Sequence, residues 1–117
     1  MIVIDRMYEL VRWYLGHLAK FPRSHRYGLG ARLEQSLYGV LEDLIEAKYS
    51  TPHERRLLLD AANRRVQVVR MFTRLADELK LLPHRSHEYA ARELNEIGSM
   101  VGGWLRQQQA VKAPSSD

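Results

Sequence analysis

Apolar residues recur along most of the chain at steps of three and four residues, the spacing of one face of an α-helix. The first such segment begins near the N-terminus and is predicted to end near Lys20. Pro22 stops it, because a residue that precedes a proline is disfavoured in helical geometry. The apolar positions that we expect to be buried are Ile4, Met7, Tyr8, Val11, Tyr14, Leu15 and Leu18.

A second helix is predicted from about Arg26 to Lys48, with Ser24 placed to cap its start. Its outward positions carry acidic residues, whereas one face is apolar throughout. The apolar positions are Leu29, Leu33, Leu37, Val40, Leu41, Leu44 and Ala47.

The stretch Thr51-Pro52-His53-Glu54 has the pattern of a capping box with proline at the first helical position. A third helix is therefore predicted from here to about Leu82, where Pro83 ends it. Its predicted buried stripe consists of Leu57, Leu58, Ala61, Val68, Val69, Phe72, Leu75, Ala76 and Leu79.

A fourth helix is predicted to follow Ser86 as its cap. Its apolar positions are Tyr89, Ala90, Leu94, Ile97, Val101, Trp104 and Leu105. Four amphipathic helices with short links, without strand-like alternation, predict an all-α fold: an antiparallel up-down-up-down four-helix bundle. We expect one domain over residues 1–109, followed by a small, polar and disordered tail at residues 110–117.

The composition is that of a soluble globular domain, with 45% hydrophobic and 27% charged residues in a chain of 117. Because cysteine is absent, neither a disulfide framework nor a thiolate metal site is expected. The N-terminal stretch MIVIDRMYEL lacks the uninterrupted apolar run of a signal peptide, and no segment approaches ~20 apolar residues. We therefore expect a cytoplasmic protein without a membrane partner.

The net charge is +4, and arginine supplies 14 of the 18 basic residues. Arginine binds phosphate and carboxylate through two parallel hydrogen bonds, which a lysine cannot do. Nucleic acid or an acidic protein surface is therefore a reasonable partner. Arginine-rich codon usage or a thermophilic surface would produce the same composition.

A helical wheel of the third helix places Arg56, Asn63, Arg70 and Arg74 within about 40° of one another, opposite the predicted apolar stripe. This basic ridge is either a docking surface for phosphate or carboxylate, or a solvated face.

Arg65 differs from the ridge, because its wheel position falls inside the apolar arc of the third helix. A buried arginine needs a partner, and acidic residues of the second helix or a neighbouring subunit could supply one.

The fourth helix contains Gly98, Gly102 and Gly103 beside Trp104, although each interior glycine costs about 1 kcal/mol relative to alanine. Small residues at this spacing allow a second helix backbone to approach closely. We expect such a contact either within the bundle or between subunits.

The first link, FPRSHRYGLGARLE, sets Arg23, His25, Arg26 and Arg32 around two glycines at the predicted start of the second helix. Unpaired N–H groups and the positive end of the helix dipole favour an anion there. Alternatively, Gly28 and Gly30 relieve crowding against the fourth helix. Both interpretations can hold together.

No catalytic constellation is recognisable. The five histidines occupy positions 17, 25, 53, 84 and 87. His84 and His87 could share a metal, but the sequence places no further ligand, and capping or solvent exposure explains them more simply. We therefore expect no metal, no cofactor and no enzymatic activity.

Three stretches together resemble one family: FPRSHRYGLGARLE, LLLDAANRRVQVVRMFTRLADELKLL and ELNEIGSMVGGWLRQ. From about residue 4 to 108, the chain is similar to the accessory variability proteins (Avd) of bacterial diversity-generating retroelements. Proteins encoded by intervening sequences of 23S ribosomal RNA genes belong to the same four-helix family. Those proteins usually carry a stretch like SIPSNIAEG where this chain reads SLYGVLEDLIEA, which favours the accessory branch.

The resemblance implies a homopentameric, barrel-like ring with a basic surface. It also implies binding to the cognate reverse transcriptase and to template RNA, in support of error-prone cDNA synthesis without polymerase activity of its own. DNA is an alternative nucleic-acid partner, and a purely structural protein is the alternative function. The arginines expected to contact phosphates or the polymerase are chiefly Arg23, Arg26, Arg56, Arg64, Arg70 and Arg74.

Overall fold

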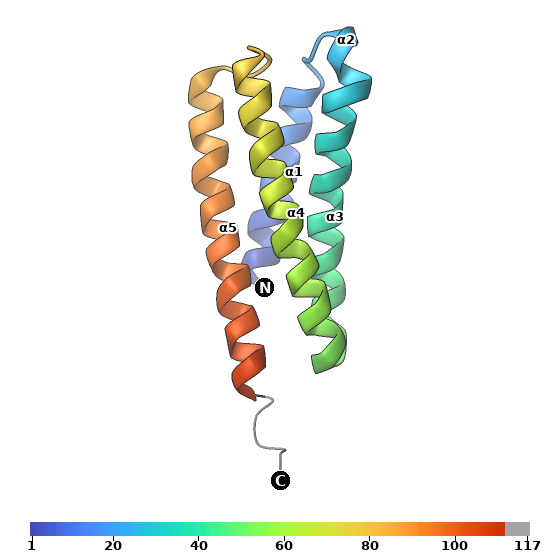
Figure 1. Ribbon diagram of the computed structural model, residues 1–117, viewed down its shortest axis with the longest axis vertical. Helices are drawn as coiled ribbons and strands as arrows, with labels where there is room; N and C mark the ends of the chain where they lie inside the picture. Colours follow the sequence, from blue (N-terminus) through green and yellow to red (C-terminus); the bar gives the residue numbers. More distant parts are fainter. Residues whose placement is uncertain (112–117) are drawn as a thin grey trace.

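The computed structural model describes residues 1–111 and the side chains of residues 1–108. Four long helices run alternately up and down and pack side by side (Figure 1). They are α1 (Ile2–Leu18), α3 (Ala31–Lys48), α4 (Pro52–Glu78) and α5 (His84–Val111). The described residues contain no strand, so the predicted all-helical bundle is confirmed. Residues 110 and 111 of the predicted tail belong to α5, and the rest of that tail lies outside the described residues.

The helices enclose one hydrophobic core. α4 packs against α3 and α5, and α1 packs against the same two helices from the other side. The largest fully buried side chains are those of Tyr14, Phe21, Met7, Leu10, Leu33, Leu37, Leu44, Leu59, Leu94 and Ile97. None of the helices in the described part has an apolar stretch that would let it span a bilayer.

The predicted apolar faces were partly wrong in α1. Tyr8 and Leu15 are exposed, whereas Val3 and Leu10 are buried. The three- and four-residue steps define an arc that is wider than the contact with the neighbouring helices, so the packing decides which edge of the arc is covered.

In α4 the predicted stripe was partly wrong: Val69 and Ala76 are buried as predicted, whereas Leu57, Val68, Leu75 and Leu79 are exposed. The residues that are buried are Leu59, Ala62, Val66, Val69, Thr73 and Ala76. The helix carries a second apolar arc on its solvent face, which spans about 80° at 100° per residue. We call this arc the outer stripe; it consists of Leu57, Val68, Met71, Leu75 and Leu79, all exposed.

The helical segment after the first link begins at Arg23, directly after Pro22, and not at Arg26. It passes through the short helix α2 (Arg23–His25) and a π-helical turn, η1 (Arg26–Gly30), into α3. Ser24 therefore lies inside the segment and does not cap it, which corrects that prediction. The start moves because Pro22 itself occupies the cap position.

The glycines of η1 do not relieve crowding against α5. A Cβ at Gly30 would lie 3.3 Å from the carbonyl oxygen of His25 and 3.4 Å from the ring of Phe21, whereas Gly28 has open space around it. Gly30 thus makes room for the fully buried Phe21 within the same turn.

The α3–α4 turn follows the sequence prediction. The hydroxyl of Thr51 accepts a hydrogen bond from the backbone N–H of Glu54, and the Glu54 carboxylate accepts one from the N–H of Thr51. The predicted capping box is therefore confirmed.

The α4–α5 turn is reached earlier than predicted. α4 ends at Glu78 rather than near Leu82, because Lys80 adopts a left-handed backbone (φ 62°) and the N–H of Leu81 donates back to the carbonyl of Ala76 over 2.8 Å. α5 begins at His84, so Ser86 lies in its first turn instead of capping it.

Candidate nucleic-acid interface

The basic ridge of α4 does not stand opposite the core. Arg56, Asn63 and Arg70 are half-buried and Arg74 is exposed. Two hollows lie between α4 and α5: Arg56 lines one with Gln108, and Arg70 and Arg74 line the other with His87. The ridge therefore faces the α4–α5 groove, while the outer stripe takes the position that sequence reasoning had assigned to the ridge.

Arg70 reaches across this groove to α5. Its Nη2 would lie 3.8 Å from a Cβ at Gly98, so the guanidinium group rests above that glycine. Its Nε is buried and makes no hydrogen bond within the described part of the chain. A buried donor without a partner is costly, about 1–3 kcal/mol and more for a charged group. Arg70 also lines a hollow of about 170 Å³, where an anion could contact its guanidinium group.

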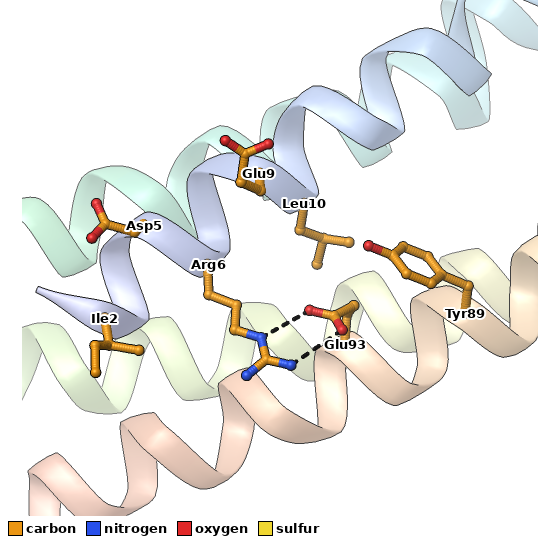
Figure 2. Close-up of a pocket in the computed structure, with 7 residues that line it drawn as sticks. All are labelled: Ile2, Asp5, Arg6, Glu9, Leu10, Tyr89 and Glu93. Atoms are coloured by element: carbon orange, nitrogen blue, oxygen red, sulfur yellow. Dashed lines mark hydrogen bonds and ion pairs between the residues drawn. The ribbon is translucent and has the colours of Figure 1, made fainter.

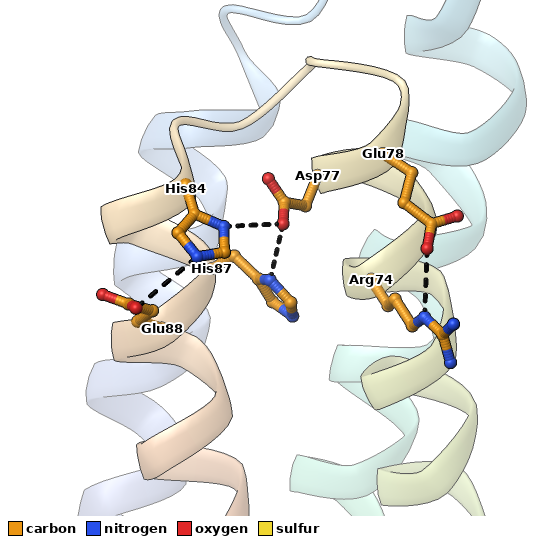
Figure 3. A network of polar contacts seen from close by, with 6 residues as sticks. All are labelled: Arg74, Asp77, Glu78, His84, His87 and Glu88. Atoms are coloured by element: carbon orange, nitrogen blue, oxygen red, sulfur yellow. Dashed lines mark hydrogen bonds and ion pairs between the residues drawn. The ribbon is translucent and has the colours of Figure 1, made fainter.

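Arg74 stands at the rim of the same hollow. Its Nε lies 3.1 Å from Oε2 of Glu78, one turn further along α4, and both side chains are well exposed (Figure 3). Exposed pairs at this spacing contribute little to stability, so an incoming phosphate can compete with Glu78 for the guanidinium.

The residues predicted around the first link lie together at the α2 end of the bundle (Figure 1). Arg23 and Arg32 are exposed, and His25 is half-buried. Arg26 donates from Nη2 to the carbonyl oxygens of Ala19 (3.2 Å) and Phe21 (3.3 Å), which closes the end of α1.

The predicted anion site at a glycine-containing helix start was wrong in its geometry. Because the helical segment begins at Arg23, Gly28 and Gly30 lie inside it and not among its free N–H groups. The binding role of the nearby arginines stays a prediction.

Arg64 is separate from both groups. It is exposed and points outward on α4, within the arc that the outer stripe covers. The predicted contact residues thus fall into three places: the α2 end, the α4–α5 groove and the outer face of α4.

Arg65 is exposed, which corrects its predicted burial, but its predicted partner on the second helix exists. Its Nε lies 3.1 Å from Oδ2 of Asp43 in α3. Burial raises the pKa of Asp43, and the nearby Arg65 offsets part of that rise. The long side chain leaves the apolar arc and carries its charge to the surface, as arginines commonly do.

The glycines of α5 make no close helix–helix contact within the described bundle. Cβ atoms at Gly102 and Gly103 would meet only Arg106, at 3.5 and 3.8 Å, and no backbone atom of another helix lies within 4 Å of any of these positions. Trp104 is half-buried against the core. The intramolecular alternative was therefore wrong, and a contact between subunits stays a prediction.

Two arginines that sequence reasoning missed hold the bundle together. Arg6 of α1 forms two hydrogen bonds with the carboxylate of Glu93 in α5, at 3.0 and 3.3 Å (Figure 2). Arg55 donates to the carbonyl oxygens of Ala47 and Ser50, both at 2.7 Å, and to Gln108 at 2.9 Å. Glu93 and Gln108 are distant in sequence from the arginines that they bind, so the spacing of residues along the chain could not indicate these contacts.

The sequence analysis paired His84 with His87 but missed Asp77, the third member of a polar cluster at the α4–α5 turn. Oδ2 of Asp77 lies 3.0 Å from Nδ1 of His84 and 2.8 Å from Nδ1 of His87 (Figure 3). Hydrogen bonding to the imidazoles lowers the pKa of Asp77, and the same contact raises the pKa of His84.

Guanidinium groups set in shallow hollows on a helical surface suit phosphate binding without base recognition. A search among curated proteins finds no match. A family model described as bAvd-like matches residues 1–108, which includes the stretch from about residue 4 to 108 over which the sequence resembles the accessory variability proteins. The match spans nearly all of the chain, and the chain therefore belongs to the bAvd-like family.

Proposed function

We propose that this chain is a non-catalytic accessory subunit of a bacterial diversity-generating retroelement. It binds the cognate reverse transcriptase in the cytoplasm, together with template RNA or its cDNA, and supports mutagenic retrohoming. Membership of the bAvd-like family supports the role. The observation that carries the nucleic-acid part is Arg70, whose buried Nε lacks a partner within the described residues and lies beside Arg74.

The nucleic-acid contact is to phosphate. Arg70 and Arg74 offer guanidinium groups at one hollow and Arg56 offers another further along the groove. Contacts of this kind position a nucleic acid without reading its bases, so sequence preference comes from the reverse transcriptase and the template.

Self-association is the second part of the proposal. Leu57 and Met71 are 55% and 61% exposed, and with the rest of the outer stripe they form an apolar face along α4 that Arg64 interrupts between Leu57 and Val68. Exposed apolar side chains gathered on one face mark an interaction site. A second copy of the chain is the occupant that fits the family, with a pentameric ring as the assembly that the resemblance implies.

Salt-dependent RNA binding tests the first part. Fluorescence anisotropy with a structured RNA is expected to show affinity that falls steeply with salt, and Arg70→Glu/Arg74→Glu is expected to weaken binding. Removing one phosphate–arginine interaction makes the slope of log K against log salt shallower by about 0.7–0.9. Arg12→Glu/Arg92→Glu makes the same change in net charge at two exposed residues outside the predicted contact places and is the control. If both variants weaken binding equally, or if binding does not depend on salt, the proposal that the α4–α5 groove binds phosphate is refuted.

Light scattering tests the second part. Met71→Gln/Leu75→Gln is expected to lower the mass of the assembly, whereas Tyr8→Gln, a change at an exposed tyrosine of α1, leaves it unchanged. A wild-type monomer would contradict the ring. An intact assembly that ignores RNA would favour the purely structural protein or the 23S intervening-sequence type. Co-purification with the cognate reverse transcriptase tests the remaining partner.

A further inference from the structure

Three potential metal ligands lie close together at the turn between α4 and α5. Asp77 lies in the last turn of α4, and His84 and His87 lie in the first turn of α5 (Figure 3). One ligand atom from each lies within 4.8 Å of the other two. The left-handed Lys80 turns the chain so sharply that residues from both helices meet here.

Small side-chain rotations would let these three residues bind a small divalent cation. Zinc binds imidazole nitrogen and carboxylate oxygen at about 2.0–2.2 Å, which places tetrahedral ligand atoms about 3.3–3.5 Å apart. The Nδ1 atoms of His84 and His87 lie 3.0 and 2.8 Å from Oδ2 of Asp77. Side-chain rotations that widen these two separations by a few tenths of an ångström, and that bring the ligand atoms of His84 and His87, now within 4.8 Å, to a similar spacing, would admit the ion.

A further carboxylate lies beside one of the two imidazoles. Nε2 of His84 lies 3.5 Å from Oε2 of Glu88, one turn along α5. If Glu88 moves closer and accepts a hydrogen bond from Nε2–H, the lone pair of Nδ1 is left for a metal, and such partners are usual behind zinc-bound histidines. His84 is 71% exposed, which gives an ion access from solvent, whereas Asp77 and His87 are largely covered and held in place.

We propose that Asp77, His84 and His87 form a Zn²⁺ site that fastens the end of α4 to the start of α5. Two imidazoles and one carboxylate leave a fourth position for water or an external ligand. The site does not depend on the proposed accessory role. It stabilises the turn beside the hollow of Arg70 and Arg74, whose lining His87 shares.

Zinc binding to the untagged full chain tests the proposal. After treatment with EDTA, titration of Zn²⁺ against a chromophoric chelator is expected to show one ion per chain. His84→Gln, His87→Gln and Asp77→Asn are each expected to abolish this binding, while His53→Gln, at an exposed histidine far from the turn, leaves it unchanged. Glu88→Gln is expected to weaken affinity about 10- to 100-fold.

Two further measurements separate a built site from loose surface binding. Co²⁺ is expected to give the visible spectrum of tetrahedral nitrogen and oxygen ligation in the wild type but not in Asp77→Asn. Zn²⁺ is expected to raise the melting temperature of the wild type but not of the three ligand variants, because it binds the folded state. Circular dichroism confirms that each variant is folded. If the wild type does not bind Zn²⁺, or if Asp77→Asn still binds it, the proposed zinc site is wrong.

Discussion

The guanidinium group of Arg65 occupies the space directly above Gly39 on the neighbouring helix. A Cβ at position 39 would lie 2.7 Å from Nη1 of Arg65, and Gly39 is buried. The arginine crosses this glycine to reach Asp43, 3.1 Å away. Gly39 therefore provides the room that an ion pair between α3 and α4 needs.

Gly39→Ala is expected to stabilise an Arg65→Ala background by about 0.5–1 kcal/mol, the gain in helix propensity. In the wild type the added methyl displaces Arg65 and weakens its pair with Asp43, so the gain is smaller or absent. Urea denaturation of the four proteins at one protein concentration measures this coupling. Gly16→Ala, at a helical glycine with nothing within 4 Å, should have the same effect in both backgrounds. If Gly39→Ala has the same effect in the wild type and in the Arg65→Ala background, there is no steric conflict between the added methyl group and Arg65.

Tyr14 and Thr73 form a buried hydrogen-bond chain. Thr73 Oγ1 lies 2.6 Å from the carbonyl oxygen of Val69 and donates to it, so the Tyr14 hydroxyl, also 2.6 Å away, donates to Thr73. Thr73→Val is expected to destabilise the fold by about 1–3 kcal/mol, because it leaves the tyrosine hydroxyl buried without a partner.

Tyr14→Phe in the Thr73→Val background is the matched test, since it removes the unsatisfied hydroxyl. The double variant is expected to recover most of the stability that Thr73→Val removes, as measured by urea denaturation. If the double variant is as unstable as the sum of the two single variants, the hydroxyls of Tyr14 and Thr73 are not coupled, which would contradict the hydrogen bond between them.

Burial raises the pKa of Tyr14 to about 12. Between about pH 10 and pH 12 the unfolded state loses this proton while the native state keeps it, so stability falls as pH rises through that window. The full effect corresponds to about 2–3 kcal/mol for a shift of this size. The comparison of wild type with Tyr14→Phe, which lacks the group, isolates it. Parallel pH profiles would show that Tyr14 ionises normally.

Much of the fold was predictable because its signals are local. Pro22 and Pro83 mark real breaks, and the capping box at Thr51 forms as its residue pattern predicts. Helix-forming spacing is a property of neighbouring residues, and so it could be identified without knowledge of the partners that each helix packs against.

The orientation of α4 could not be predicted in the same way. The helix carries two apolar arcs, one facing the core and one formed by the outer stripe, and periodicity alone cannot rank them. The buried face of α4 lies at a different angle around the helix from the predicted one. The arginines that were assigned to the solvent face therefore line the α4–α5 groove. Tertiary packing decides which of the two arcs faces the core, and no short sequence pattern reveals it.

The polar contacts between distant residues were equally hidden. Asp77 comes within 3.0 Å of His84 because the turn at Lys80 folds the chain back, and a left-handed backbone at a lysine is an unusual conformation with no reliable sequence signal. For Arg65 the requirement for a partner was predictable from its wheel position, but its exposure was not.

The last prediction concerns Arg55, which joins the α3–α4 turn to α5. Its three hydrogen bonds join the end of α3 to Gln108 of α5, and each uses a different guanidinium nitrogen. A lysine retains the charge but cannot reproduce this planar fork. Arg55→Lys is therefore expected to lose most of the stability that Arg55→Met loses, about 2 kcal/mol, on the scale of hydrogen bonds to charged groups.

Hydrogen exchange locates this destabilisation. Amides near Ala47 and Ser50 are expected to exchange faster in Arg55→Lys, because their turn loses its clamp, while those near Tyr14 change only with global stability. Arg56→Lys alters the adjacent residue, for which no such hydrogen bonds are present in the described structure, and should leave the α3–α4 turn protected. If both lysine variants behave alike, charge alone holds this turn and the fork geometry of Arg55 is irrelevant.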